Sequence, residues 1–178
     1  MNFETPLGIF TMLDEPCYSF GSADNTRQYP NELLLNSLYK PTSVHGVLLD
    51  DQAFLVLGDG GGCSGIHKHS LVFYNGAAYI AVGRHIAKII PHPFSVVWIL
   101  QVDDATCFGV HANEDLNALL SHGELDICRF SETGEILWSA SGADIFSEGF
   151  SLLSTHVEAI DFNQNIYRFG YERGETHV

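Results

Sequence analysis

Basic side chains are scarce in this sequence. Lys and Arg together number 8 in 178 residues, whereas Asp and Glu number 22, so the formal net charge at pH 7 is −14. A chain with so negative a charge repels the phosphate backbone of nucleic acids. The composition therefore excludes general nucleic-acid binding, and it favours a basic protein as the partner of any binding function.

Long apolar runs and a secretory leader are also lacking. The longest apolar stretch, around Val96–Leu100, is far shorter than the roughly 20 residues of a membrane-spanning helix. The N-terminal segment MNFETPLGIF carries Glu4 where a secretory signal has Lys or Arg. We therefore expect no membrane span and a cytoplasmic location.

Closely spaced cysteines are absent as well. The four cysteines are far apart and form no Cys-x-x-Cys motif: Cys17, Cys63, Cys107 and Cys128. In a chain of this size without a secretory signal, buried reduced thiols are the more common state than disulfides. We expect buried, reduced thiols here.

Apolar residues are plentiful, at 46%, against 17% charged residues. Over a length typical of one domain, this composition is enough for a hydrophobic core. The sequence predicts a single domain over residues 1–178. Residues 1–43 are expected to form an irregular lead-in with a short helix, and residues 44–178 a β-rich body.

Two short helices are predicted, one at about 31–39 and one at about 113–122. In each, an Asn stands at the N-cap position and an acidic residue follows in the first turn. Pro41 and Gly123 supply the stop signals. Leucines recur on one face of each segment: Leu34, Leu35 and Leu38 in the first, and Leu116, Leu119 and Leu120 in the second.

The rest of the chain favours antiparallel β structure. Asn75-Gly76 separates two β-rich runs, and this dipeptide is the strongest short hairpin signal because both residues tolerate positive φ. Residues 50–52 separate the runs 44–49 and 53–57 in the same way. Turn signals recur about every ten residues, which is typical of an antiparallel β-sandwich or a partly open barrel built from hairpins.

Residues 131–138, SETGEILW, resemble the turn between strands in β-propeller blades of the quinoprotein type. The one echo, DFNQNIYRF at 161–169, lacks the Gly and the Trp, and the N-terminal half has no such motif. Four short blades would need the whole chain. The pattern therefore predicts an ordinary hairpin at 131–138 rather than a propeller.

The charges are segregated along the sequence. Between Asp59 and Asp103 there is no acidic residue, and this stretch holds Lys68, Arg84, Lys88 and the histidines His67, His69, His85 and His92. From Asp103 to Asp161 there are twelve acidic residues and one basic residue, Arg129. Two interpretations stay open: the two stretches pair across the fold, or the acidic stretch forms a negative face that steers a basic partner. The second predicts these partner-binding residues: Asp103, Asp104, Glu114, Asp115, Glu124 and Asp126.

A glycine-rich segment, residues 58–65, precedes His67 and His69. It contains Gly60-x-Gly62-x-x-Gly65, but a strand and a hairpin follow, whereas a dinucleotide site needs a helix there. Gly61 and the pair His67-x-His69 resemble the first half of the cupin metal motif. Residues i and i+2 of a strand point to the same side, so both imidazoles can bind one ion.

The cupin resemblance implies an enzyme with one divalent transition metal. Cupins have a Glu four or five residues after the second His, where this sequence has Phe73 and Tyr74, and the second cupin motif is missing. Completing the site would need other ligands from the set Cys63, His85 and His92. A third option is a Cys–His nucleophile pair, because Cys63–His67 and Cys107–His111 both have a spacing of four.

The leading hypothesis is a non-enzymatic acidic protein-interaction module without a cofactor. Small acidic inhibitors of basic toxins, the immunity proteins, are similar in composition and size. The alternative is a metal-dependent cupin-like enzyme that uses His67 and His69, and a structural domain of a larger assembly stays open. The relative positions of His67, His69, His85 and His92 separate the first two, since a cluster favours the enzyme.

Overall fold

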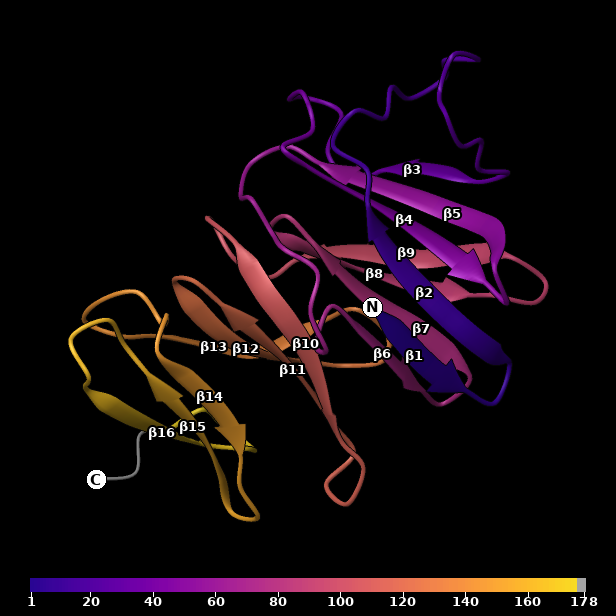
Figure 1. Ribbon diagram of the computed structural model, residues 1–178. Coiled ribbons are helices and arrows are strands. Elements are labelled where there is room, and N and C mark those ends of the chain that lie inside the picture. Colours follow the sequence, from indigo (N-terminus) through magenta and orange to yellow (C-terminus); the bar gives the residue numbers. More distant parts are fainter. Residues whose placement is uncertain (176–178) are drawn as a thin grey trace.

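The computed structural model describes residues 1–175, which fold into strands without any helix (Figure 1). Among these residues there is accordingly no helix of the length and apolarity that a bilayer crossing requires. The strands are β1 (Asn2–Thr5), β2 (Gly8–Asp14), β3 (Glu32–Leu34), β4 (Ser43–Leu49), β5 (Gln52–Asp59), β6 (Leu71–Tyr74), β7 (Ala77–Val82), β8 (His85–Ile90), β9 (Ser95–Gln101), β10 (Cys107–Asn113), β11 (Ala118–Gly123), β12 (Asp126–Phe130), β13 (Ile136–Ser141), β14 (Gly149–Leu152), β15 (His156–Ile160) and β16 (Ile166–Gly170).

The strands form four sheets that follow one another along the chain. The first has the order β1-β2-β4-β5-β3, the second β6-β7-β8-β9, the third β10-β11-β12-β13 and the fourth β14-β15-β16. In the last three, each strand pairs antiparallel with its neighbour in sequence, and β3–β5 is a parallel pair in the first. This confirms the predicted antiparallel β fold built from hairpins.

Three buried clusters join successive sheets face to face. Phe10 and Leu55 of the first sheet pack with Ile80 and Ile89 of the second. The other two clusters are built in the same way: Tyr79 and Ile86 with Val110 and Leu119 between the second and third sheets, and Leu120 and Trp138 with Val157 and Phe169 between the third and fourth. The sheets are therefore layers of one stack, as in a β-sandwich.

The two ends of the stack differ. Tyr18 and Tyr29, from the segment between β2 and β3, pack on Val44 and Val56 and cover the outer face of the first sheet. On the fourth sheet, Glu158 and Arg168 are cross-strand partners and form an ion pair with a 3.1 Å N–O distance, and Ile166 on the same face is exposed.

The expected helix at 113–122 is wrong. This segment contains the end of β10, a turn and most of β11. Asn113 Oδ1 does accept the N–H of Leu116, but Asn117 then takes φ +46°, so the cap closes a turn. Leu119 and Leu120 point to opposite faces of β11, into two different clusters. A strand buried on both faces thus imitates the leucine spacing of a helix.

The expected helix at 31–39 and the irregular lead-in also differ from the structure. Residues 32–34 form β3, held on β5 by the backbone bond from Val56 N to Asn31 O. Residues 2–14 contain β1 and β2, which pair with each other and with β4. The pairs β2–β4 and β3–β5 join residues far apart in the sequence and cannot be predicted from local pattern, whereas β1–β2 is a local hairpin that the sequence analysis missed.

The predicted hairpins at residues 50–52 and 75–76 are confirmed. Asp50, Asp51, Asn75 and Gly76 all have positive φ, the conformation of two-residue type I′ turns. The SETGEILW segment forms the β12–β13 turn. Four successive, mostly antiparallel sheets follow one another over the described chain as propeller blades do, which differs from the expectation of an ordinary hairpin without propeller-like blades.

Candidate functional site

The structure brings His67 and His69 together and adds two histidines from the third sheet. The ring centroids of His67 and His69 are 6.1 Å apart, and those of His69 and His111 are 4.1 Å apart. His122 follows at 6.5 Å from His111, and Phe150 of β14 packs against both rings. We call His67, His69, His111 and His122 the histidine cluster.

His85 and His92 lie outside the histidine cluster. His85 begins β8, where Nδ1 is bonded to Asp59, and His92 is in the β8–β9 hairpin. The four histidines of the acid-free stretch therefore do not form one site. Sequence reasoning missed His111 and His122, because their place beside His69 depends on the packing of β10 and β11.

Backbone bonds hold the cluster in place. Residues 67–70 form a tight turn, with Ser70 N donating to His67 O and His67 N donating to Ser70 Oγ. The turn is then fixed on β10, because Val110 N donates to His69 O over 2.8 Å. Gly109 permits this approach, since a Cβ there would lie 2.8 Å from His69 Cβ.

The donor geometry of the cluster does not fit a metal ion. Nδ1 of His67 accepts the backbone N–H of His69 over 3.2 Å, which occupies one of its two ring nitrogens. The rings of His69 and His111 are inclined by only 31°, so they lie one over the other. No three His, Cys, Asp or Glu side chains within residues 1–175 form a group that can hold a metal ion.

Three histidines of the cluster have lowered pKa values. Burial, together with smaller effects of neighbouring histidines, lowers the pKa of His111 to about 2 and that of His122 to about 4. Burial lowers the pKa of His69 too, with smaller effects of Lys68 and His67. Desolvation favours the neutral imidazole in each case.

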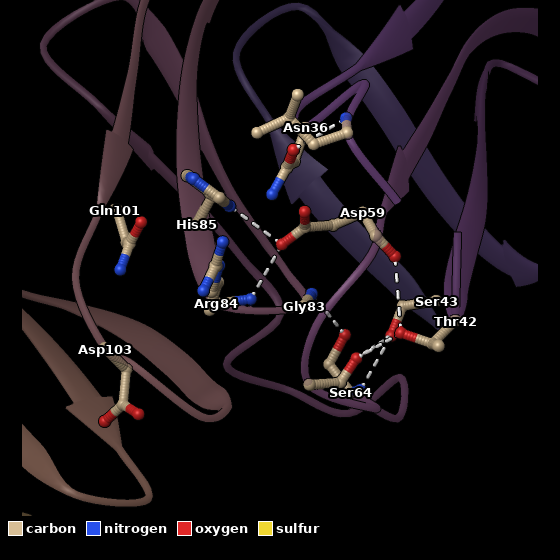
Figure 2. A network of polar contacts seen from close by, with 12 residues as sticks. Asn36, Thr42, Ser43, Asp59, Ser64, Gly83, Arg84, His85, Gln101 and Asp103 are labelled. Carbon is tan, nitrogen blue, oxygen red and sulfur yellow. Dashed lines mark hydrogen bonds and ion pairs between the residues drawn. The ribbon is translucent and has the colours of Figure 1, made fainter. Parts of the chain in front are cut away.

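A second polar network surrounds Asp59, and Figure 2 shows it from close by. Asp59 is fully buried, and its Oδ2 accepts hydrogen bonds from Arg84 N at 2.9 Å and from His85 Nδ1 at 2.8 Å. Beside it, Ser64 Oγ accepts the N–H of Gly83 at 2.8 Å. The network fixes the glycine-rich loop on the β7–β8 turn, so these polar groups hold the fold together.

The Asp59 contact recurs between the later sheets. In each case an aspartate at the end of one sheet accepts a hydrogen bond from the turn between the second and third strands of the next sheet. The three contacts are Asp59 Oδ2 with Arg84 N, Asp103 Oδ2 with Leu125 N, and Asp144 Oδ2 with Asn163 Nδ2. The spacing of roughly 40 residues is the period of a propeller blade.

The predicted partner-binding residues fall into three groups. Asp103 is buried, and its carboxylate accepts the N–H groups of Ala105, Leu125 and Asp126. Asp104, Glu124 and Asp126 lie around the β11–β12 turn, whereas Glu114 and Asp115 lie in the β10–β11 hairpin. With roughly 3.3 Å per strand residue, the last two groups are about 20 Å apart at opposite ends of β10 and β11.

The acidic stretch is hardly neutralised by basic side chains. Of its twelve carboxylates, within residues 1–175, Glu132 pairs with Lys88 and Glu158 pairs with Arg168, and the others have no Lys or Arg partner. Arg129, the one base of this stretch, donates to the carbonyl of Tyr171 instead. Within residues 1–175, the ion pair between the acid-free stretch and the acidic stretch is that of Lys88 with Glu132.

The cysteines give a mixed result. Cys107 and Cys128 are buried free thiols, as expected, whereas Cys17 and Cys63 are free but exposed. Burial raises the pKa of Cys107 and of Cys128, which keeps both thiols protonated. Cys107 Sγ contacts Gly109 O and Cys63 Sγ contacts Thr42 O, and across residues 1–175 no cysteine is hydrogen-bonded to a histidine.

Comparisons with known proteins bear on the fold alone. No protein-family model matches the chain, and no curated protein matches it. Among solved structures the chain is similar to BamB from Moraxella catarrhalis, which has a β-propeller-like fold, with a TM-score of 0.52 and 13% identity over 76% of this chain. The match spans 43% of the BamB chain. It agrees with the succession of blade-like sheets.

Proposed function

We propose that the chain is a non-enzymatic, cytoplasmic protein-interaction module that binds a basic protein partner. The observation that carries this proposal is the set of carboxylates between residues 103 and 161 that lack a Lys or Arg partner within residues 1–175. A surface with unneutralised charge of one sign accelerates encounter with a partner of the other sign. An inhibitor of a basic protein, as in the immunity proteins, is one such module.

The surface that suits this partner is at the β11–β12 end of the third sheet. We call Asp104, Glu124, Asp126 and Asp144 the acidic end. One groove there is lined by Asp104, Asp126 and Ile136, and another by Asp126, Asp144 and Leu125. Leu125 and Ile136 are 39% and 46% exposed, so apolar contact area lies between the carboxylates. Apolar centres with a charged rim are typical of protein interfaces.

The test compares two matched charge variants of the immobilised chain. The triple variant Asp104→Asn, Glu124→Gln, Asp126→Asn neutralises the acidic end. The control variant Glu114→Gln, Asp115→Asn, Glu135→Gln removes the same number of charges at the opposite end of the sheet. Proteins of the native cell extract are captured at low and at high salt and identified.

We expect wild type and control to retain the same basic protein, and the acidic-end variant to lose it. We also expect the capture to weaken as salt rises, because salt screens exposed charges. If both variants lose the captured protein equally, binding depends on net charge alone and not on the acidic end. Capture that does not change with salt would exclude electrostatic steering. Either result contradicts the proposal.

A further inference from the structure

A groove of about 530 Å³ lies beside the histidine cluster, between residues 68–72, β10 and β14. Its walls include Lys68, His69, His111 and Phe150. This volume is within the range of small-molecule sites, which combine apolar walls with a few polar groups. We call it the histidine groove.

The charge of the histidine groove is opposite to that of the acidic end. None of its lining residues is acidic, although the chain carries a net charge of −14. Lys68 is exposed at the groove and has no ion pair within residues 1–175. An unopposed ammonium group in a carboxylate-free groove favours an anion.

The walls of the groove are aromatic. The centroid of the His69 ring lies 4.1 Å from that of His111, and the centroid of the Phe150 ring lies 4.5 Å from that of His111. Leu152 and Val72 complete the apolar lining. Aromatic faces in such an array are complementary to another planar ring, by offset or edge-to-face packing.

His111 supplies a polar group without a partner. It is 7% exposed, and its Nε2 is buried and has no hydrogen-bond partner among residues 1–175. Leaving a buried polar atom unpaired costs about 1–3 kcal/mol, so structures normally satisfy it.

We propose that the histidine groove binds a small aromatic carboxylate, with its ring against His69, His111 and Phe150 and its charge at Lys68. The ring packing and the ammonium group act on different parts of the ligand, so the site selects a compound that has both. The binding is independent of the basic protein partner, because the acidic end contributes no residue to the groove.

Benzoate titration followed by NMR of the histidine rings tests the proposal on the full chain at neutral pH. The ring signals are assigned with the variants His69→Gln and His111→Gln. We expect saturable shifts of the His69 and His111 signals, and weaker binding of cyclohexanecarboxylate, which lacks the planar ring, and of benzyl alcohol, which lacks the charge. Inorganic phosphate, an anion without a ring, is expected to bind more weakly than benzoate.

Two lysine variants provide the matched comparison. Lys68→Gln is expected to raise the dissociation constant of benzoate about fivefold, the size of a partly exposed ion pair. Lys40→Gln removes another exposed lysine, outside the groove, and is expected to leave the dissociation constant of benzoate unchanged. Three results would each overturn the proposal: shifts that do not saturate, equal benzoate affinities of the two lysine variants, or an affinity for phosphate equal to that for benzoate.

Discussion

Asp59, the last residue of β5, is hydrogen-bonded to His85, the first residue of β8, with 2.8 Å between Asp59 Oδ2 and His85 Nδ1. The two residues come from different sheets, and Asp59 is fully buried. The contact therefore links the first sheet to the second inside the protein.

Asp59→Ala is expected to lower the free energy of unfolding by about 3 kcal/mol. The substitution leaves Arg84 N and His85 Nδ1 without their acceptor inside the protein. Urea denaturation monitored by tryptophan fluorescence measures the change. Asp24→Ala, at an exposed aspartate, is the control, with an expected change below about 0.5 kcal/mol. Similar losses in both variants would refute the buried link.

Gly123 and Asp103 are expected to behave as a coupled pair. A Cβ at residue 123 would collide with Oδ2 of Asp103, which is bonded to Leu125 N and Asp126 N. Gly123→Ala must displace this carboxylate, with a loss of about 2 kcal/mol of unfolding free energy. In an Asp103→Ala background the collision with the carboxylate is gone and only the close contact with the backbone oxygen of Asp126 remains, so the same substitution is expected to cost less than in the wild type. A strictly additive double-mutant cycle would contradict the contact.

The sequence predicts hairpins well where the turn chemistry is local. Asn75-Gly76 determines its turn from two residues, because positive φ is required at both positions and both residues tolerate it. Leu119 and Leu120 show the limit of such reasoning. Their positions in the sequence predict one apolar face of a helix. In the structure β11 lies between two sheets, and each of the two leucines packs into a different core.

The candidate sites were less predictable than the fold. The i, i+2 argument placed His67 and His69 in a strand; the structure has the two imidazoles close together, but in a turn that precedes β6. Their neighbours His111 and His122 come from a sheet that follows about 40 residues later, and no spacing rule connects them. The three aspartates that contact the next sheet are regularly spaced, but the short sequences around them differ from one another. The repeat is therefore recognised from the hydrogen bonds and not from the sequence.

The thiols are expected to divide into two reactive and two protected groups. Cys17 and Cys63 are exposed, whereas Cys107 and Cys128 are buried with raised pKa values. Because the thiolate is the reacting species, the buried pair is protected both by burial and by its protonation. Mass spectrometry after brief iodoacetamide treatment is expected to show two alkylations in the folded chain and four in denaturant. Cys63→Ser should remove one of the two, and rapid labelling of Cys107 in the folded chain would contradict its burial.

The histidine cluster makes stability depend on pH. Burial lowers the pKa of His111 to about 2 and that of His122 to about 4, both below the ordinary value of 6.5 that applies in the unfolded chain. Below pH 6.5 the unfolded state therefore binds protons that the folded state does not. The contribution of these two histidines to the free energy of unfolding is fully present above pH 6.5. It falls toward pH 5 by up to about 1.4 kcal/mol per pH unit for each histidine.

Urea denaturation between pH 7.5 and 5, above the range in which ordinary carboxyl groups titrate, measures this slope of stability against pH. His111→Phe is expected to reduce the slope by the share of one histidine, because the aromatic contacts stay and one of the two titrating groups is gone, while His122 still contributes. His92→Phe, at an exposed histidine outside the cluster, should keep the slope of the wild type. Equal slopes in all three proteins would mean that His111 is not held neutral by its burial.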